Sequence, residues 1–162
     1  MNGERVVSRY KAMLGRLAPT ATLGLCLDER WHRADFYVDS GAAFSIVHGD
    51  FARDAGFDFE KGERSLVKVG DGSLIPVFLH RVPVQIGPHR LEVRMGFSNQ
   101  LGIGFHLLGR LDVFDHFRVC FHEREDSVIF DPYPPRGEPA TNQPTKRTRH
   151  EQSFFSRDGH RH

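Results

Sequence analysis

The sequence predicts an all-β protein, a barrel or sandwich of short strands with a few short helices. Three observations support this prediction. Short apolar runs recur from Leu23 to Phe130. Turn-forming pairs such as Asp71-Gly72 separate these runs. The 162 residues include 39% hydrophobic residues, which is enough for one domain with a core.

The first eighteen residues are predicted to form an amphipathic helix. Apolar residues between Val6 and Leu17 recur at helical spacing, with arginines and a lysine between them. Pro19 follows this pattern and would end the helix. We therefore expect residues 1–18 to precede the main domain as a helix, packed either on that domain or over a partner or cleft.

Residues 19–131 are predicted to form the main β domain. The turn Asp71-Gly72 suits a two-residue hairpin, and Pro76 places its strand at a sheet edge or in an irregular region. Short helices are expected over residues 48–56 and after Arg110, where residues 111–117 have helical spacing. Strands are expected over residues 22–27, 34–38, 44–47, 66–69, 74–78, 82–86, 91–97, 118–121 and 127–130.

Composition excludes several classes of function. The net charge of +1 argues against a dedicated nucleic-acid binder, and no apolar run approaches the length of a membrane span. The first residues lack the apolar segment of a signal peptide, so we expect a soluble, cytoplasmic protein. Cys26 and Cys120 lie in apolar runs and are expected to be buried, reduced thiols. Residues 132–162 are rich in proline and basic residues, which predicts a disordered tail.

The ten histidines do not predict a metal site. They are scattered along the chain, and none forms a His-x-x-x-His pair on a credible helix beside a third ligand. No glycine motif for holding phosphate is present either. We therefore expect no metal and no cofactor other than water.

Asp39 is the candidate catalytic residue. It follows the strand-forming run Phe36-Tyr37-Val38 and is followed by Ser40 and Gly41. A hydroxyl and nearby backbone N–H groups can hold its carboxylate in a tight turn, because glycine bends without a Cβ clash. Such a carboxylate is a candidate for activating water.

Two carboxylates in contact would share one proton, so that one accepts a proton while the other donates. This chain has one Asp-[Ser/Thr]-Gly, so the second aspartate would come from a second copy of the chain.

A second segment supports this interpretation. The apolar run that ends in Leu107-Leu108-Gly109-Arg110 lies about seventy residues after Asp39. Together, Asp39-Ser40-Gly41-Ala42 and this segment resemble the retropepsin-like aspartic proteases, over roughly residues 23–130. The resemblance implies an acid-protease barrel that works as an obligate homodimer, with one active site on the two-fold axis.

The resemblance also implies roles for individual residues. Asp39 would form the dyad with its counterpart, Ser40 would form hydrogen bonds across the dimer, and Gly41 would pass close to the substrate. The hairpin around residues 70–72 falls where the family has its flap, which closes over bound peptide. The residues implied to contact substrate are Ala42, Val69, Gly70, Asp71, Gly72, Leu74 and Ile75.

Residues Leu108, Gly109 and Arg110 would support the catalytic loop from below. Here the sequence departs from the retroviral members, which commonly place an acid two residues after the conserved alanine-glycine turn as a partner for the arginine. This chain has Ala43-Phe44 there. Arg110 would therefore need another acid, either Asp112, Asp35 or a residue of the second chain.

The sequence thus predicts an aspartic endopeptidase with peptide or protein substrates. Two alternatives remain. One is a catalytically inactive retropepsin-like domain that dimerises or binds peptides. The other is a β-barrel adaptor in which Asp39-Ser40-Gly41 is only a turn.

Overall fold

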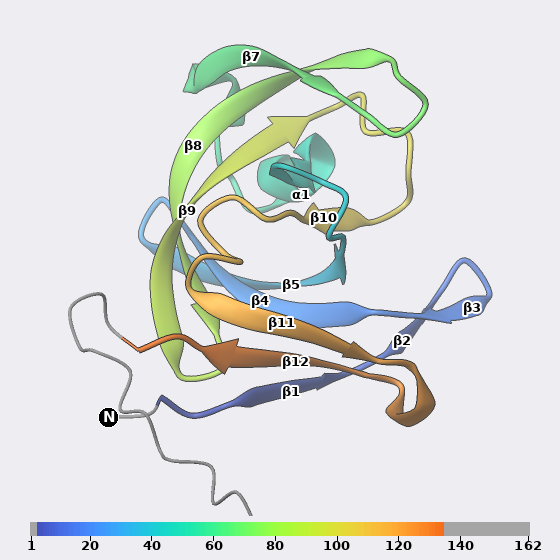
Figure 1. Ribbon diagram of the computed structural model, residues 1–162. Coiled ribbons are helices and arrows are strands. Elements are labelled where there is room, and N and C mark those ends of the chain that lie inside the picture. The colour runs from blue at the N-terminus through green and yellow to red at the C-terminus, as the bar shows by residue number, and fades with distance from the viewer. Residues whose placement is uncertain (1–2, 135–162) are drawn as a thin grey trace, which may run out of the picture.

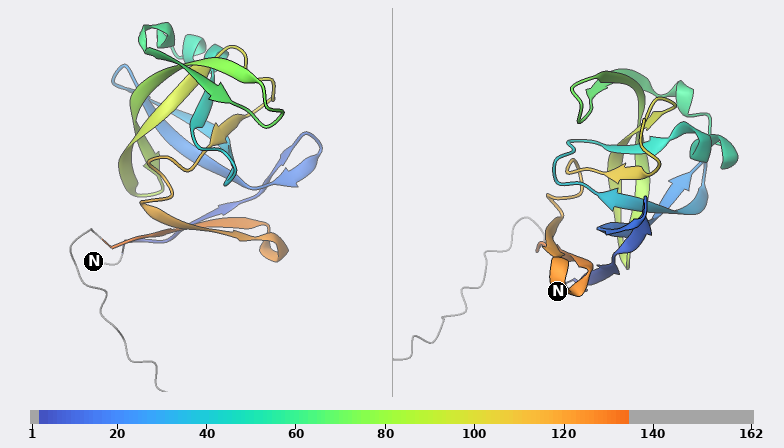
Figure 2. Two further views of the ribbon diagram at one scale, coloured as in Figure 1. Left: turned by 45° about the horizontal axis from the view of Figure 1, so that its top comes forward. Right: turned by 90° about the vertical axis from the view of Figure 1, so that its right-hand side faces the viewer.

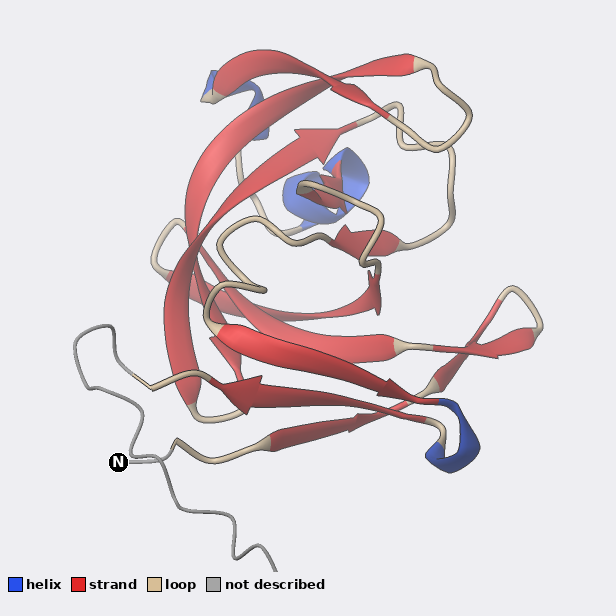
Figure 3. Cartoon of the chain, viewed as in Figure 1, coloured by secondary structure: helices blue, strands red, loops and turns tan. Residues whose placement is uncertain are grey.

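The computed structural model describes residues 3–134, and these form a β-barrel with an additional small sheet and a projecting hairpin (Figure 1; Figure 3). One short helix, α1 (Gly49–Asp54), follows β6, as predicted. Two single-turn 3-10 helices cover Phe59–Lys61 and Glu123–Glu125. The strands are β1 (Val6–Arg9), β2 (Lys11–Met13), β3 (Arg16–Ala18), β4 (Thr20–Leu27), β5 (Arg30–Val38), β6 (Ser45–His48), β7 (Glu63–Lys68), β8 (Leu74–Ile86), β9 (His89–Ser98), β10 (His106–Leu108), β11 (Phe117–His122) and β12 (Ser127–Pro132).

Seven strands form the main sheet, in the order β4-β5-β10-β6-β9-β8-β7. β4 also pairs with β8 at Gly24 and Leu25, which closes the sheet into a barrel. Inward positions alternate along the long strands and carry apolar side chains, so the barrel is filled by side chains. The fully buried ones include Leu23, Leu25, Phe36, Val38, Val84, Ile86, Met95, Phe97 and Leu108.

The predicted N-terminal helix is wrong. Residues 6–18 form β1, β2 and β3 instead, and β1 pairs with β12 in a second sheet of order β1-β12-β11. The apolar spacing was misleading because Leu14 and Leu17 are 80% and 59% exposed and therefore do not form a buried helical stripe. Leu14 and Gly15, both with positive φ, instead make the turn of the β2–β3 hairpin.

Two other local predictions are corrected. The predicted loop 28–33 is mostly strand, because Asp28 and Glu29 alone make a tight turn with positive φ and the polar residues after them lie on β5. Of the predicted helix 111–117, residues 111–116 form consecutive turns and Phe117 begins β11, since Asp112 adopts φ 61° and interrupts the helical path.

The predictions for the two cysteines and for the C-terminal tail can also be compared with the structure. Cys26 and Cys120 are free, as expected, but both are partly exposed because they lie on outward positions of their strands. β12 extends to Pro132, and the remainder of the predicted tail from residue 135 lies outside the described residues. Between residues 3 and 134, no helix has the length and apolar character needed to cross a membrane.

Candidate active site

Asp39 lies where two parallel strands end side by side. β5 ends at Val38, which is in register with Leu108 at the end of β10. The backbone N–H of Asp39 donates to the carbonyl oxygen of Leu108 at 3.0 Å. Both neighbouring side chains, Val38 and Leu108, are fully buried. The backbone of Asp39 is therefore fixed by the barrel core, and the sequence places an acid at the first position outside it.

The loop after Asp39 orients the carboxylate. The backbone N–H of Gly41 donates to Oδ1 of Asp39 at 2.8 Å, and the N–H of Ala42 donates to the Asp39 carbonyl oxygen at 3.2 Å. These contacts form the turn that the Asp-Ser-Gly sequence predicts. Ser40 and Gly41 are exposed, whereas Asp39 is partly buried. No other donor within residues 3–134 binds this carboxylate, so Oδ2 remains available to a water molecule or a second acid.

Gly109 packs closely against the loop that follows Asp39. A Cβ at this position would lie only 2.4 Å from the carbonyl oxygen of Phe44 and 3.0 Å from that of Ala42. The N–H of Gly109 donates to the buried Ser45 hydroxyl at 3.0 Å, and the N–H of Arg110 donates to the Ala42 carbonyl at 3.0 Å. Ser45 could not be predicted as a loop support, because nothing in the sequence around it marks its hydroxyl as an acceptor.

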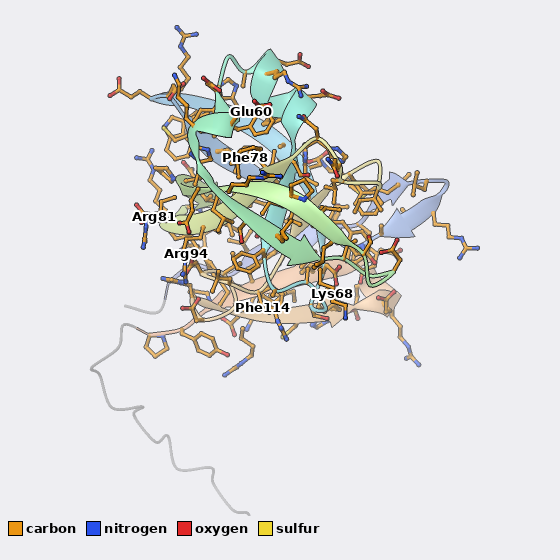
Figure 4. The ribbon with its side chains drawn as sticks, turned by 90° about the horizontal axis from the view of Figure 1, so that it is seen from above. Glu60, Lys68, Phe78, Arg81, Arg94 and Phe114 are labelled. Carbon is orange, nitrogen blue, oxygen red and sulfur yellow. The ribbon has the colours of Figure 1, made fainter. Side chains whose placement is uncertain are left out.

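A cleft of about 590 Å3 lies in front of Asp39. It is bounded by the tip of the β7–β8 hairpin and by the loop between β9 and β10. Figure 4 looks down on this hairpin, with Lys68 toward its tip and Phe78 farther back along β8. The lining residues are Tyr37, Asp39, Val69, Gly70, Asp71, Ser73, Ile75, Gln100, Leu101, Gly102, Ile103, Phe105 and Leu107.

The structure brings most of the predicted hairpin residues to this cleft, but not all. Val69, Gly70, Asp71 and Ile75 line it together with Asp39. Ala42, Gly72 and Leu74 do not line it in the single chain, and Leu74 is 59% exposed. Pro76 lies in the part of β8 that pairs with β7 alone, which agrees with the predicted edge position.

The hairpin tip is a three-residue loop rather than the predicted two-residue turn. The N–H of Val69 donates to the Ser73 carbonyl at 2.9 Å, and Gly72 adopts φ 86°, the left-handed conformation that favours glycine. The carboxylate of Asp71 accepts hydrogen bonds from the Ser73 hydroxyl at 2.6 Å and from its N–H at 2.8 Å. These bonds lower the pKa of Asp71, so this side chain is used to hold the loop together.

The opposite wall of the cleft was missed by sequence reasoning. Phe105 stacks on Tyr37, with ring centroids 5.1 Å apart, and both line the cleft with Leu101 and Ile103. A signal existed for Tyr37, because it is two residues before Asp39 on a strand and therefore lies on the same face. The loop of residues 99–105 carries no comparable pattern.

Arg110 does not pair with either intrachain acid that the sequence suggested. Asp112 accepts from Arg94 at 2.9 Å, an ion pair that lowers the pKa of Asp112 and raises that of Arg94. Asp35 accepts from Lys11 at 2.8 Å. The Arg110 guanidinium is exposed and makes no ion pair with residues 3–134.

His106 lies behind the cleft, at the start of β10. Its Nδ1 accepts the backbone N–H of His48 at 3.1 Å, and its ring packs against Phe36 and Phe51 at centroid distances of 5.3 and 5.1 Å. Burial, and secondarily the neighbouring His48, lowers the pKa of His106 to about 4, while Asp35 opposes this shift. At neutral pH the ring is therefore neutral and keeps its acceptor for His48.

We expect this histidine to destabilise the protein in acid. A histidine of the unfolded chain titrates near 6.5. Between this pH and about 4 the unfolded chain binds the additional proton, so the free energy of unfolding falls as the pH falls. The free energy of unfolding falls by at most about 3 kcal/mol in total. Solvent screening at the partly exposed ring reduces this loss. The measurement is urea unfolding at several pH values between 3.5 and 7.

The variant His106→Asn retains an acceptor for His48 and should show a shallower dependence of unfolding free energy on pH. The exposed His122→Asn provides the matched control and should keep the parent slope. Equal slopes for parent and His106→Asn would contradict the assignment.

Comparison with solved structures identifies the fold. A retropepsin-like aspartic protease from Rickettsia conorii superposes with a TM-score of 0.57 at 16% identity, over 80% of this chain and 91% of that chain. EIAV protease in complex with the inhibitor HBY-793 matches with a TM-score of 0.44 at 18% identity, over 65% of this chain and 91% of that chain. No protein-family model and no curated protein sequence matches. The chain has a retropepsin-like fold, which confirms the fold predicted from its two short segments.

Proposed function

We propose that the protein is an aspartic endopeptidase that acts as a homodimer, with Asp39 of each chain forming the catalytic dyad. The position of Asp39 in the cleft under the β7–β8 hairpin is the observation that carries the proposal. The retropepsin-like fold supports it. Each chain supplies one such aspartate, so a dyad requires two chains.

The chemistry uses one ionised and one protonated carboxyl group. Two carboxyl groups in contact cannot both ionise without a large cost, so the pair retains one proton. The ionised member takes a proton from a bound water, and the water oxygen attacks the peptide carbonyl carbon. The protonated member donates its proton to the carbonyl oxygen. These steps form a tetrahedral intermediate. A proton is then transferred to the amide nitrogen, the C–N bond breaks, and a carboxylic acid and an amine are released.

The substrate would be an extended peptide. The cleft is lined largely by apolar side chains, among them Val69, Ile75, Leu101, Ile103 and Leu107. An extended peptide in such a cleft can form backbone hydrogen bonds with a hairpin while alternate side chains enter pockets. We therefore expect a preference for apolar residues on both sides of the cleaved bond.

The proposal is tested with a diverse peptide library at pH 4–7, over a range of protein concentrations. A homodimeric enzyme should lose specific activity on dilution, in step with dissociation measured by sedimentation. Peptide binding by a dimer without any cleavage would leave only the inactive, peptide-binding alternative. A monomer that neither binds nor cleaves peptides would favour the adaptor.

Arg110 provides a prediction about the dimer. Its guanidinium is exposed beside the catalytic loop, where Ala43 and Phe44 line the same surface hollow. A carboxylate of the second chain is the remaining partner among those that the sequence suggested. We expect Arg110→Gln to raise the dimer dissociation constant by about ten- to a hundredfold, as for other paired charges at interfaces.

Sedimentation measures this effect, and Arg124→Gln, an exposed arginine of the β11–β12 turn, is the control. Equal dissociation constants for Arg110→Gln and the parent would remove Arg110 from the interface.

A further inference from the structure

The β2–β3 hairpin projects from the barrel on the same side as the tip of the β7–β8 hairpin (Figure 1; Figure 2). It is tied to the barrel by Lys11, whose ammonium donates to the two carboxylate oxygens of Asp35 at 2.8 and 3.0 Å and to the Thr22 hydroxyl at 3.0 Å. The hairpin is therefore held over the outer face of β4 and β5.

That outer face leads directly to the catalytic residue. Asp35, Tyr37 and Asp39 alternate along one face of the chain, because side chains two residues apart on a strand point the same way. The first holds the hairpin, the second lines the cleft, and the third is the proposed catalytic acid. At about 3.3 Å per residue, Asp35 lies roughly 13 Å from Asp39 along the strand.

The hairpin tip meets the end of the cleft wall. A Cβ placed on Gly104 would lie 4.0 Å from Cδ2 of Leu14. The next residue, Phe105, stacks on Tyr37, and both belong to the cleft lining. Leu14 thus lies beside the loop that carries two of the apolar cleft residues, Ile103 and Phe105.

Neither local structure nor burial accounts for a leucine at the tip. Leu14 has φ 49°, a conformation that favours glycine and asparagine and costs a bulky residue on the order of 1 kcal/mol. Its side chain is 80% exposed, so burial within the chain offsets little of this cost. Backbone strain at an exposed apolar residue beside a cleft points to a ligand contact.

We propose that the β2–β3 hairpin forms an outer subsite of the cleft, in which Leu14 selects an apolar side chain of the bound peptide. This inference rests on the proposed function, because the occupant is the same extended peptide. Leu14 lies outside the residues that line the cleft around Asp39, so the selected side chain is one beyond those that flank the cleaved bond.

The test uses the full chain carrying Asp39→Asn, so that captured peptides stay intact. A displayed library of peptides of about twelve residues, roughly 40 Å when extended, is selected on this protein, and the affinities of selected peptides are measured. Adding Leu14→Asn, which suits the turn, should weaken binding about five- to tenfold for peptides with an apolar outer residue. Peptides shortened to remove that residue should bind both proteins equally. Leu17→Thr, on the same hairpin, is the control and should not change binding.

Three outcomes overturn the inference, and a fourth separates it from the proposed function. Affinities unaffected by Leu14→Asn would remove the subsite, and so would the capture of no peptide at all. A shift of the monomer–dimer equilibrium by Leu14→Asn without a change in peptide affinity would assign the hairpin to the chain interface instead. Peptide capture without cleavage by the wild-type protein would remove the proposed protease activity and leave the subsite in place.

Discussion

Asp39→Asn is expected to abolish peptide cleavage while the protein remains folded. Asparagine has nearly the same shape and keeps an oxygen that can accept the 2.8 Å hydrogen bond from the Gly41 N–H. It cannot take a proton from water at neutral or mildly acidic pH. Removing a general acid–base group costs about 10²- to 10⁴-fold in rate, and here both members of the dyad are lost together. We expect a fall in kcat/KM of at least about 10³-fold.

The measurement is the cleavage of a library-selected peptide, with folding and self-association followed in parallel. Asp54→Asn removes the same charge from an exposed position at the end of α1 and should cleave at the parent rate. Cleavage that survives Asp39→Asn in a pure sample would end the assignment of Asp39.

Mixing the wild-type protein with Asp39→Asn tests whether the active site is shared between two chains. In an equal mixture that exchanges subunits freely, about one quarter of the dimers carry two aspartates. A shared dyad should therefore give about one quarter of the activity of the same total amount of wild-type protein. If each chain acted alone, the mixture would retain about half.

The fold could be predicted because its two diagnostic segments are adjacent in space. Asp39 and Leu108 lie about seventy residues apart in the sequence, yet a backbone hydrogen bond joins them at 3.0 Å. The apolar residues before each segment belong to buried strands, and Gly109 permits a close approach of the loop backbone. These requirements are local and leave a recognisable sequence.

The N-terminal hairpin could not be predicted from local pattern. Its strands are three residues long, and their residues happen to repeat at helical spacing. β2 and β3 pair with each other, whereas β1, the strand before them, pairs with β12 more than a hundred residues away. Such pairing leaves no mark on a short segment.

The far wall of the cleft could not be predicted from the sequence either. The residues between Ser98 and His106 have no regular periodicity, and their place opposite the β7–β8 hairpin follows from the way β9 and β10 flank β6. The partner of Arg110 was also not predictable, since the two candidate acids are taken by Arg94 and Lys11, both distant in sequence.

Gly109→Ala is expected to produce a large loss of stability. The added methyl group would lie 2.4 and 2.5 Å from the carbonyl oxygen and carbon of Phe44, which are backbone atoms that no rotamer change can move. The barrel core fixes one side of this contact through Leu108, so the strain falls on the loop of residues 42–44. Overpacking of this kind costs about 3 kcal/mol. Because that loop follows directly from Asp39, we also expect the folded fraction to lose about 10²-fold in cleavage rate through misplacement of the carboxylate.

Urea unfolding at one fixed protein concentration measures the stability, since self-association would otherwise change the midpoint. Gly102→Ala is the control, because a methyl group there meets no atom within 4 Å and the backbone is not left-handed. Its unfolding free energy should stay within about 0.5 kcal/mol of the parent. If Gly109→Ala were as stable as Gly102→Ala, the loop would be free to move away from β10, and β10 could not hold Asp39 rigidly.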